Sequence, residues 1–410
     1  PDVGPRHALA MWGRRFRNMR KLSVLVIHNQ YQQPGGEDAV VRAEVDLLRQ
    51  AGHRVVQFTQ NNTNLASCTP LEKAALFLTT TWNRTARLKI RELIEKERPD
   101  VVHCHNLLPQ VSPSAYYACQ SAGVPVVQTL HNYRLFCPAG TFFHNGRVCQ
   151  DCTRSLAYGV KQACYRGSRL QTATVAMMLA FHRFRETWTS FVDAYIALTQ
   201  FDRNFFVELG LPDKKVHVKP NFLARDPGQR AIPGSYALFV GRLSPEKGVL
   251  EMLQMWLRLP HIPLVVVGNG PLYDDAWQMV RRSGSAHISL LGRLSAEETQ
   301  AQMKDARFLV FPSRWYEPFG MALIEAAACG VPAIAARVAG VPELVIDNKT
   351  GLLFDLQKTG DLADKARWAW THPAEMDAMG FEARQLCRQN FTAEKNYESL
   401  INIYRSVVRN

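Results

Sequence analysis

Apolar-rich runs of four to six residues recur along the chain and alternate with longer segments in which apolar residues have helical spacing. Short runs without a polar face are typical of strands buried in a parallel sheet. The expected strands are 22–27, 54–58, 100–103, 125–130, 194–198, 236–240, 264–267, 287–291, 308–311 and 332–335. The expected helices include 40–52, 88–97, 116–122, 170–188, 274–282, 320–329, 397–408 and one that begins near 246. This alternation predicts an α/β protein with doubly wound, Rossmann-like parallel sheets.

The chain has 410 residues, which is too many for one ordinary hydrophobic core, so two domains are expected. The strand–helix pattern completes one cycle before about residue 220 and then starts again. A passage at 228–234 contains two glycines and a proline, as a connection between domains often does. We therefore expect one domain at 1–220, a second at 221–396, and a helical tail at 397–410.

The formal net charge is +13, which suits polyanionic partners such as nucleotide diphosphates or an anionic membrane. A solvated basic surface is the alternative interpretation. We expect no nucleic-acid partner, because the sequence contains no recognised nucleic-acid-binding module. No run approaches the ~20 apolar residues of a membrane span, and the basic N-terminal segment lacks the apolar run of a signal peptide. Nine cysteines, an odd number, favour a reducing compartment, so we expect a cytoplasmic protein.

Ligands of doubly wound sheets bind beyond the carboxyl ends of the strands, near helix N-termini. The segment Gly241-Arg-Leu-Ser-Pro-Glu-Lys-Gly248 directly follows an expected strand. Its two cations, Arg242 and Lys247, bracket a turn that enters a helix, an arrangement suited to clamping a diphosphate. The alternative is that both are ordinary exposed basic residues.

A second segment, Ser313-Arg-Trp-Tyr-Glu-Pro-Phe-Gly-Met321, also follows an expected strand. Glu317 lies at its mouth, and Glu325 lies about one turn inside the next helix, from which it can lean back towards the helix start. Carboxylates can accept hydrogen bonds from vicinal hydroxyls of a ribose or hexose. The helix start also leaves backbone N–H groups free to donate, at Phe319, Gly320 and Met321. The alternative is a capping acid and an unrelated acid on the helix face.

Two glycine turns complete the candidate loops. Gly268-Asn-Gly270 follows the strand at 264–267, and Pro34-Gly35-Gly36-Glu37 follows the first strand. Glycine lets the backbone approach a ligand closely. The turn at Pro34–Glu37 matches neither a Walker loop nor the full dinucleotide fingerprint. The turn at Gly268–Gly270 is weak evidence by itself, because most glycine turns after a strand bind no ligand.

These segments resemble glycosyltransferase family four, the large retaining group with the GT-B architecture, over nearly the whole chain. The resemblance is carried by Gly35-Gly36-Glu37, His131-Asn132, the Gly241–Gly248 segment, Gly268-Asn269-Gly270 and the two glutamates that seven residues separate. It implies two Rossmann-like domains that face a central cleft. The acceptor is then expected on the N-terminal domain and the nucleotide sugar on the C-terminal domain, with the closing helix crossing back to the first domain.

The resemblance implies a role for each matching residue. Arg242 and Lys247 would hold the donor diphosphate and stabilise its charge as it leaves, and Glu325 would accept from the ribose. Glu317 would contact the donor hexose, and His131, a structural histidine on the alternative interpretation, would lie near the transferred sugar. The further donor-binding positions are Gly35, Gly36, Gly268, Gly270, Arg293, Phe319, Gly320 and Met321.

The implied activity is retaining transfer of a hexose-type sugar from a UDP- or GDP-sugar to a glycan, lipid-linked or small-molecule acceptor, in polysaccharide or glycoconjugate biosynthesis. We expect catalysis without a cofactor, because the sequence lacks the Asp-any-Asp metal motif of the other major transferase architecture. Two alternatives stay open. One is a GT-B sugar-nucleotide epimerase, and the other is a catalytically silent nucleotide-sugar-binding scaffold.

Residues 137–168 form a cysteine-rich insertion that contains four of the nine cysteines, at Cys137, Cys149, Cys152 and Cys164. The central Cys-Gln-Asp-Cys pair has zinc-knuckle spacing, so a structural zinc is the leading interpretation. Four thiols without a metal, or a redox-labile pair, are the alternatives. Many members of the family lack such an insertion, so the resemblance does not decide between them.

The expected helix at 170–188 combines an apolar content that includes Met177, Met178 and Phe181 with the cations Arg183 and Arg185. Together with the basic N-terminal segment at 14–21, it would suit peripheral docking on the inner face of an anionic membrane, near a lipid-linked acceptor. A helix packed inside the N-terminal domain is the alternative.

Overall fold

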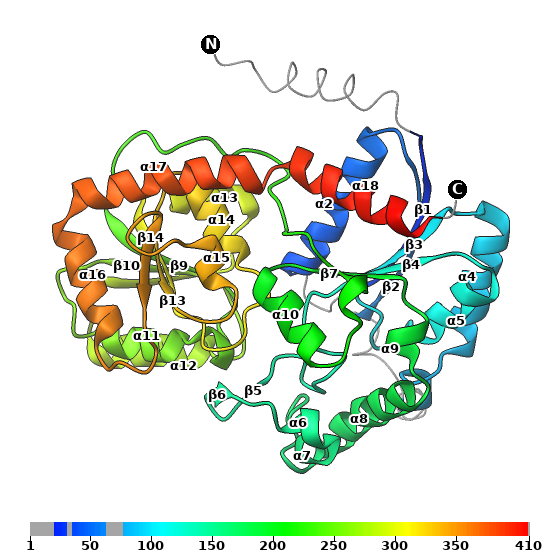
Figure 1. Ribbon diagram of the computed structural model, residues 1–410. Helices are drawn as coiled ribbons and strands as arrows, with labels where there is room; N and C mark the ends of the chain where they lie inside the picture. Colours follow the sequence, from blue (N-terminus) through cyan, green and yellow to red (C-terminus); the bar gives the residue numbers. More distant parts are fainter. Residues whose placement is uncertain (1–19, 31–34, 63–76, 409–410) are drawn as a thin grey trace. The chain divides into compact units, whose positions relative to one another are not determined.

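The computed structural model describes residues 20–30, 35–62 and 77–408 (Figure 1). Its internal contacts divide the chain into two units. The first unit comprises Pro1–Thr141, Gln150–Pro220 and Ala393–Asn410, and the second comprises Phe142–Cys149 and Asn221–Thr392. The expected basic residues Arg14, Arg15 and Arg17, and also Pro34, lie outside the described residues. Within the described ranges, no helix combines the length and the apolarity that crossing a bilayer requires.

The first unit contains a six-stranded parallel sheet with the order β2-β1-β3-β4-β7-β8. Its strands are β1 (Ser23–Gln30), β2 (Arg54–Asn61), β3 (Val101–Cys104), β4 (Val126–Thr129), β7 (Ala194–Ala197) and β8 (Val216–Val218). Strand β2 is added on one side of β1, and the later strands β3, β4, β7 and β8 are added on the other side. The topological switch point therefore lies between β1 and β3. The side chains of β3, β4 and β7 are buried throughout, as the apolar runs of the sequence predict.

The helices of the first unit are α2 (Gly36–Gln50), α4 (Arg84–Glu97), α5 (Ser114–Ser121), α6 (Asp151–Arg154), α7 (Leu156–Lys161), α8 (Arg169–Phe184), α9 (Thr187–Ser190), α10 (Gln200–Glu208) and α18 (Ala393–Val407). The helix expected at 170–188 is confirmed as far as residue 184, but its last turn is wrong. Helix α8 ends at Phe184, and Glu186 takes a left-handed conformation with φ of 51° before the short helix α9. The buried Trp188 therefore belongs to the short helix α9 and not to α8.

Helix α18 contributes its buried face to the first unit, although it is far from that unit in the sequence. The Tyr397 hydroxyl lies 2.8 Å from Nε2 of His53, which follows α2. The Tyr404 hydroxyl lies 2.7 Å from Nδ1 of His103 on β3. Both hydroxyls are buried, so these contacts satisfy polar groups that would otherwise destabilise the core.

The second unit contains a six-stranded parallel sheet with the order β11-β10-β9-β12-β13-β14. Its strands are β9 (Tyr236–Val240), β10 (Leu264–Val267), β11 (Ile288–Gly292), β12 (Ala306–Phe311), β13 (Ala333–Ala336) and β14 (Gly351–Phe354), and a separate hairpin pairs β5 (Phe143–His144) with β6 (Arg147–Val148). This is the Rossmann order, with its switch point between β9 and β12. The prediction of doubly wound α/β sheets is therefore confirmed.

Helices cover both faces of the second sheet, with α11 and α12 on one side and α13, α14 and α17 on the other (Figure 1). The helices are α11 (Val249–Trp256), α12 (Tyr273–Ser283), α13 (Ala296–Lys304), α14 (Met321–Ala328), α15 (Val341–Leu344), α16 (Asp361–Thr371) and α17 (Pro373–Asn390). The helix expected from about 246 begins three residues later. Pro245–Lys247 forms a 3₁₀ turn, and Gly248 takes a left-handed conformation with φ of 67° before α11 starts.

Candidate functional site

The loops after β9, β10 and β11 are joined to one another by backbone hydrogen bonds at the carboxyl edge of the second sheet. The amide of Gly241 donates to the carbonyl of Val267 at 3.1 Å, and the amide of Leu243 donates to the carbonyl of Asn269 at 3.1 Å. The amide of Gly268 donates to the carbonyl of Gly292 at 2.7 Å. Because each loop is fixed to its neighbour, this edge of the sheet is a preorganised surface.

Gly268 and Gly270 make this contact between loops sterically feasible. A Cβ atom on Gly268, whose φ is 140°, would lie 1.8 Å from the carbonyl oxygen of Gly241. A Cβ atom on Gly270 would lie 2.4 Å from the carbonyl oxygen of Leu243. The sequence suggested that these glycines allow close approach of a ligand. In the structure they allow close approach of the loop that carries Arg242 and Lys247.

Lys247 and Glu317 meet across the switch point, from the loops after β9 and β12. The Lys247 ammonium donates to Oε2 of Glu317 at 2.6 Å. The same oxygen accepts from the Ser313 hydroxyl at 2.7 Å and from the Trp315 indole at 2.8 Å. Glu317 is only 5% exposed, and the ammonium also lies 5.5 Å from the centre of the Trp315 ring. The structure thus holds a partly buried cation where the sequence predicts a diphosphate clamp.

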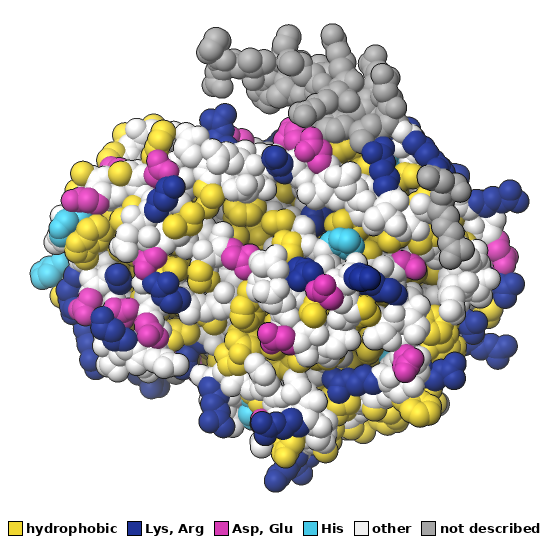
Figure 2. Space-filling view, in the orientation of Figure 1, with side chains coloured by type: hydrophobic (Ala, Val, Ile, Leu, Met, Phe, Trp, Pro, Cys, Tyr) yellow, Lys and Arg dark blue, Asp and Glu magenta, His cyan; other side chains and the backbone are white. Residues whose placement is uncertain are grey.

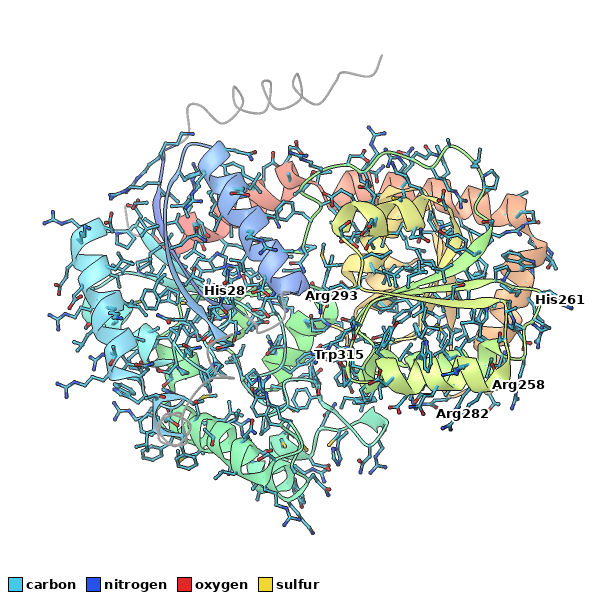
Figure 3. All side chains as sticks on the ribbon, turned by 180° about the vertical axis from the view of Figure 1, so that it is seen from behind. His28, Arg258, His261, Arg282, Arg293 and Trp315 are labelled. Atoms are coloured by element: carbon cyan, nitrogen blue, oxygen red, sulfur yellow. The ribbon has the colours of Figure 1, made fainter. Side chains whose placement is uncertain are left out.

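Arg242, the other cation of the predicted clamp, is exposed and has no ion-pair partner among the described residues. Arg293 is also exposed and directly follows β11. Figure 3 shows Arg293 and Trp315 at one end of this sheet and Arg258 and His261 at its opposite end. The predicted donor residues of the second unit are therefore gathered at the carboxyl edge.

Arg314 fastens the loop after β12 to the loop after β9. Its amide donates to the carbonyl of Glu246 at 2.8 Å, and its guanidinium pairs with Glu251 on α11. Gly248 leaves room for this contact, since a Cβ atom there would lie 2.3 Å from the carbonyl oxygen of Pro312. The sequence interpretation assigned no role to Ser313, Arg314 or Trp315. The available signal was their position between a buried strand and Glu317.

The start of α14 places the remaining residues of the predicted donor segment. Gly320 precedes the helix, Met321 is its first residue, and Phe319 is buried against Phe391 with ring centroids 5.9 Å apart. Glu325 lies on the same helix, and burial raises the pKa of its carboxyl group. The helix start therefore offers backbone donors and a sheltered carboxylate on one element.

In the first unit, Gly35 and Gly36 lie at the N-terminus of α2. Gly35 is the N-cap, Gly36 is the first helical residue, and the Gly35 amide donates to the Asp38 carboxylate at 3.0 Å. His131 directly follows the run that forms β4 and is half-buried. Its Nε2 atom lies 2.9 Å from Nδ1 of His105. Burial lowers the pKa of His131 well below its ordinary value, with smaller contributions from the neighbouring His28 and Lys219, so the imidazole is neutral near pH 7.

Comparison with protein families identifies both units. Residues 34–226 match the family model Glycosyltransferase Family 4, and residues 227–386 match the family model Glycosyl transferases group 1. The chain belongs to glycosyltransferase family four. The two matches meet close to the division between the sheets, so each sheet corresponds to one half of the family four architecture.

Individual proteins show the same relationship. The family four chain is 31% identical over 183 residues to D-rhamnosyltransferase WbpZ of Pseudomonas aeruginosa, which covers 44% of the chain and 48% of WbpZ, about half of that relative's length. It is 29% identical over 318 residues to glycogen synthase of Mycobacterium tuberculosis, covering 76% of the chain and 70% of that enzyme. The crystal structure of Anabaena HepE with UDP and glucose superimposes with a TM-score of 0.66 at 18% identity, over 94% of this chain and all of that one. The GT-B fold is therefore shown.

The cysteine-rich insertion lies within the residues that match the first family model. Cys137 and Cys152 are buried, and Cys149 and Cys164 are partly exposed. A Cβ atom on Gly159 of α7 would lie 2.9 Å from the sulfur of Cys152, so the insertion packs closely around that thiol. Cys149 ends the short segment that belongs to the second unit, while the other three belong to the first.

Proposed function

We propose that the chain transfers a hexose-type sugar from a UDP- or GDP-sugar, with retention, to a glycan, lipid-linked or small-molecule acceptor. The observation that carries this proposal is the contact of Lys247 with Glu317 across the β9–β12 switch point. Doubly wound sheets bind nucleotides at this place. The two side chains are 70 positions apart in the sequence and meet at 2.6 Å, beside the exposed Arg242.

The charges of this group suit departure of a nucleoside diphosphate. Breaking the glycosidic bond leaves negative charge on the diphosphate and an oxocarbenium-like sugar. Lys247 and Arg242 stabilise the departing diphosphate, and a cation that is already in place stabilises it without reorganisation. Glu317 engages Lys247, Ser313 and Trp315 through Oε2, so its Oε1 is the atom we assign to a hexose hydroxyl. Glu325 accepts from the ribose, and the transfer requires no metal ion.

Relatives support the same chemistry. Anabaena HepE has been crystallised with UDP-glucose as well as with UDP and glucose. A further relative is a GDP-mannose-dependent mannosyltransferase of Mycolicibacterium smegmatis, 30% identical over 163 residues. Both relatives are consistent with a UDP- or GDP-sugar donor and with a role in polysaccharide or glycoconjugate biosynthesis.

The proposal is tested by incubating the purified chain with a panel of UDP- and GDP-sugars and following release of UDP or GDP, with and without candidate acceptors. We expect release from one donor class, retention of the anomeric configuration in the product, and no loss of activity with a metal chelator. Tight nucleotide-sugar binding without turnover would instead indicate a scaffold. Conversion of the donor to its epimer would indicate an epimerase.

We further propose that α8 docks the protein on an anionic membrane. Six of its sixteen residues are buried, including Met178 and Leu179, but Leu170 and Phe184 are 71% and 84% exposed, and the exposed Arg185 directly follows Phe184. On the face drawn in Figure 2, Lys and Arg side chains are interspersed with Asp and Glu side chains. We therefore expect the protein to float with vesicles containing phosphatidylserine, and we expect this flotation to be lost in a Leu170→Ser, Phe184→Ser double variant. Equal flotation of both proteins would contradict docking through α8.

The zinc prediction also remains a proposal. We expect the purified protein to contain about one equivalent of zinc, as structural sites usually do. Cys152→Ser should remove the metal, because it replaces a thiolate ligand, and should destabilise the insertion, because Cys152 is buried against Gly159. Elemental analysis measures the zinc content. Less than about half an equivalent in the unaltered protein would contradict a structural site.

A further inference from the structure

A buried polar cluster lies next to His131 in the first unit. The Lys219 ammonium pairs with Oε1 of Glu44 on α2, and both side chains are almost fully buried. The other oxygen of Glu44, Oε2, lies 3.8 Å from Nε2 of His105. His105 in turn contacts His131 through the Nδ1–Nε2 pair at 2.9 Å. A continuous path therefore runs from a buried ion pair to the histidine that the family four resemblance places beside the transferred sugar.

His103 holds the ring of His105 in place without joining this path. Its Nδ1 bonds to the Tyr404 hydroxyl at 2.7 Å, and its Nε2 bonds to the Thr129 hydroxyl at 2.8 Å. The rings of His103 and His105 have centroids 4.1 Å apart. The peptide of His105 is also fixed, because its carbonyl accepts from the Gln128 amide at 2.7 Å. His105 therefore has one defined position.

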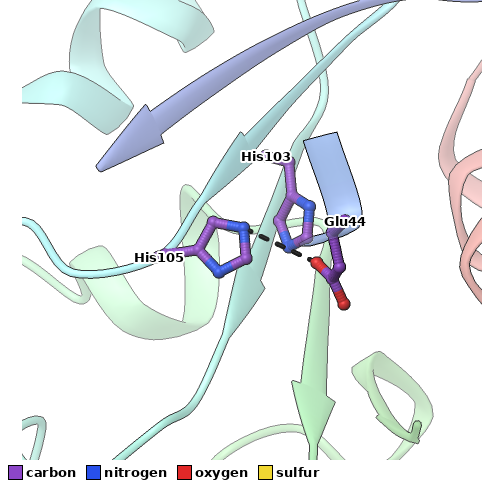
Figure 4. A group of neighbouring side chains, drawn as sticks. All are labelled: Glu44, His103 and His105. Carbon is purple, nitrogen blue, oxygen red and sulfur yellow. Dashed lines mark ion pairs between the residues drawn. The ribbon is translucent and has the colours of Figure 1, made fainter. Parts of the chain in front are cut away.

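Glu44, His103 and His105 could in principle ligate a metal ion, because three of their ligand atoms lie within 4.8 Å of one another (Figure 4). The hydrogen bonds favour another interpretation. Both nitrogens of His103 already bond to hydroxyl groups, and the Lys219 ammonium already neutralises Glu44. A divalent cation would have to displace these partners and would lie beside a buried ammonium, which repels it.

The buried carboxylate determines which nitrogen of His105 carries the proton. Oε2 of Glu44 has no hydrogen-bond partner among the described residues, and a lone pair of His105 pointing at it would be repelled. The Nε2–H form of His105 is therefore favoured, and Nδ1 of this neutral ring is then an acceptor. The contact at 2.9 Å then requires His131 to donate through its Nε2–H.

We infer that Glu44 and His105 are positioning residues that hold neutral His131 in the tautomer whose Nδ1 carries no proton. This inference rests on the proposed function, because it assigns His131 the task of accepting a hydrogen bond from a substrate hydroxyl. A positively charged or Nδ1-protonated ring could not accept that bond. The charged groups nearby are already paired with other residues, which agrees with a neutral His131 ring. The Lys219 ammonium pairs with Glu44, and the Asp38 carboxylate bonds to His28 at 2.8 Å. Burial also lowers the pKa of His105 well below its ordinary value.

The tautomer is measured directly by the ¹⁵N chemical shifts of the imidazole nitrogens of His131. In the unaltered protein we expect the shift of an unprotonated nitrogen at Nδ1. In Glu44→Gln the carboxylate charge is lost and the amide can either donate or accept, so we expect Nδ1 of His131 to become protonated in a substantial fraction of molecules. Tyr397→Phe is the matched control, because it removes an equally buried hydroxyl from α18 that contacts His53 and not this path. An unchanged His131 shift in folded Glu44→Gln protein would overturn the inference.

Kinetics supply a second readout. Glu44→Gln should lower kcat by roughly 10- to 100-fold, the scale of losing a partner that orients a metal-ligating histidine. The KM for the donor should change little, because Lys247 and Arg242 are unaltered. Tyr397→Phe should retain the kcat of the unaltered protein. The chemical shifts are read without turnover, so absence of transferase activity would reject the proposed function and leave the tautomer result standing. If elemental analysis found zinc that is lost in Glu44→Gln but kept in Cys152→Ser, the metal would be bound at Glu44, His103 and His105, and the inference would be overturned.

Discussion

Lys247→Ala is expected to lower turnover with the preferred nucleotide sugar by at least ~100-fold, the scale of losing one preorganised charge-stabilising contact. Lys247 is the cation that the structure holds ready at the switch point, at 2.6 Å from Glu317 and 5.5 Å from the centre of the Trp315 ring. Removing it takes positive charge from the place where the diphosphate is proposed to leave. Steady-state release of UDP or GDP measures the effect.

The matched control is Lys349→Ala, which removes an exposed lysine from the turn before β14 and should retain normal turnover. Lys247→Ala also leaves the buried carboxylate of Glu317 with only neutral partners, Ser313 and Trp315, which costs stability. Thermal unfolding must therefore be measured alongside activity. Near-normal turnover in folded Lys247→Ala protein would refute the clamp.

Gly268→Ala is expected to lower the free energy of unfolding of the second unit by more than roughly 3 kcal/mol, placing it among the severe single substitutions. The new Cβ atom would lie 1.8 Å from the carbonyl oxygen of Gly241, and the φ of 140° is one that alanine rarely adopts. Since neither loop can move without breaking its hydrogen bonds to the other, the strain cannot be relieved locally. Urea unfolding followed by circular dichroism measures the loss.

Gly284→Ala separates the clash from the backbone strain. Gly284 also has a positive φ, of 66°, but a Cβ atom there meets nothing within 4 Å. Its expected cost is about 1 kcal/mol, the usual penalty for alanine in place of glycine in such a conformation. Equal losses in the two variants would show that contact between the loops contributes nothing to stability.

The central strands could be predicted from sequence because burial on both faces leaves an uninterrupted apolar run. Strands β9 and β10 begin and end where the sequence predicts, at 236–240 and 264–267. The edge strands β8 and β14 were not predicted, since β8 has only three residues and β14 follows a turn-rich stretch. The break between α8 and α9 was also invisible, because the apolar spacing continues past Glu186 while the backbone does not.

The candidate site could be predicted as separate loops but not as contacts. Each loop is recognisable from glycines, cations or acids after a strand, yet nothing near Lys247 in the sequence specifies that Glu317 will be its partner. That pairing depends on β9 lying beside β12, which is a property of the whole sheet. The cluster behind His131 is a stronger case, because Lys219, Glu44 and Tyr404 come from three distant segments and carry no local motif.

Helix α18 has a consequence for biosynthesis of the protein. Tyr397 and Tyr404 of this helix contact His53 and His103 of the first unit. The whole second unit is nevertheless translated before the helix. On the ribosome, the first sheet must therefore wait with its α18-binding face uncovered while the second unit emerges. Production of the first unit as an isolated fragment would therefore require α18 to be supplied with it.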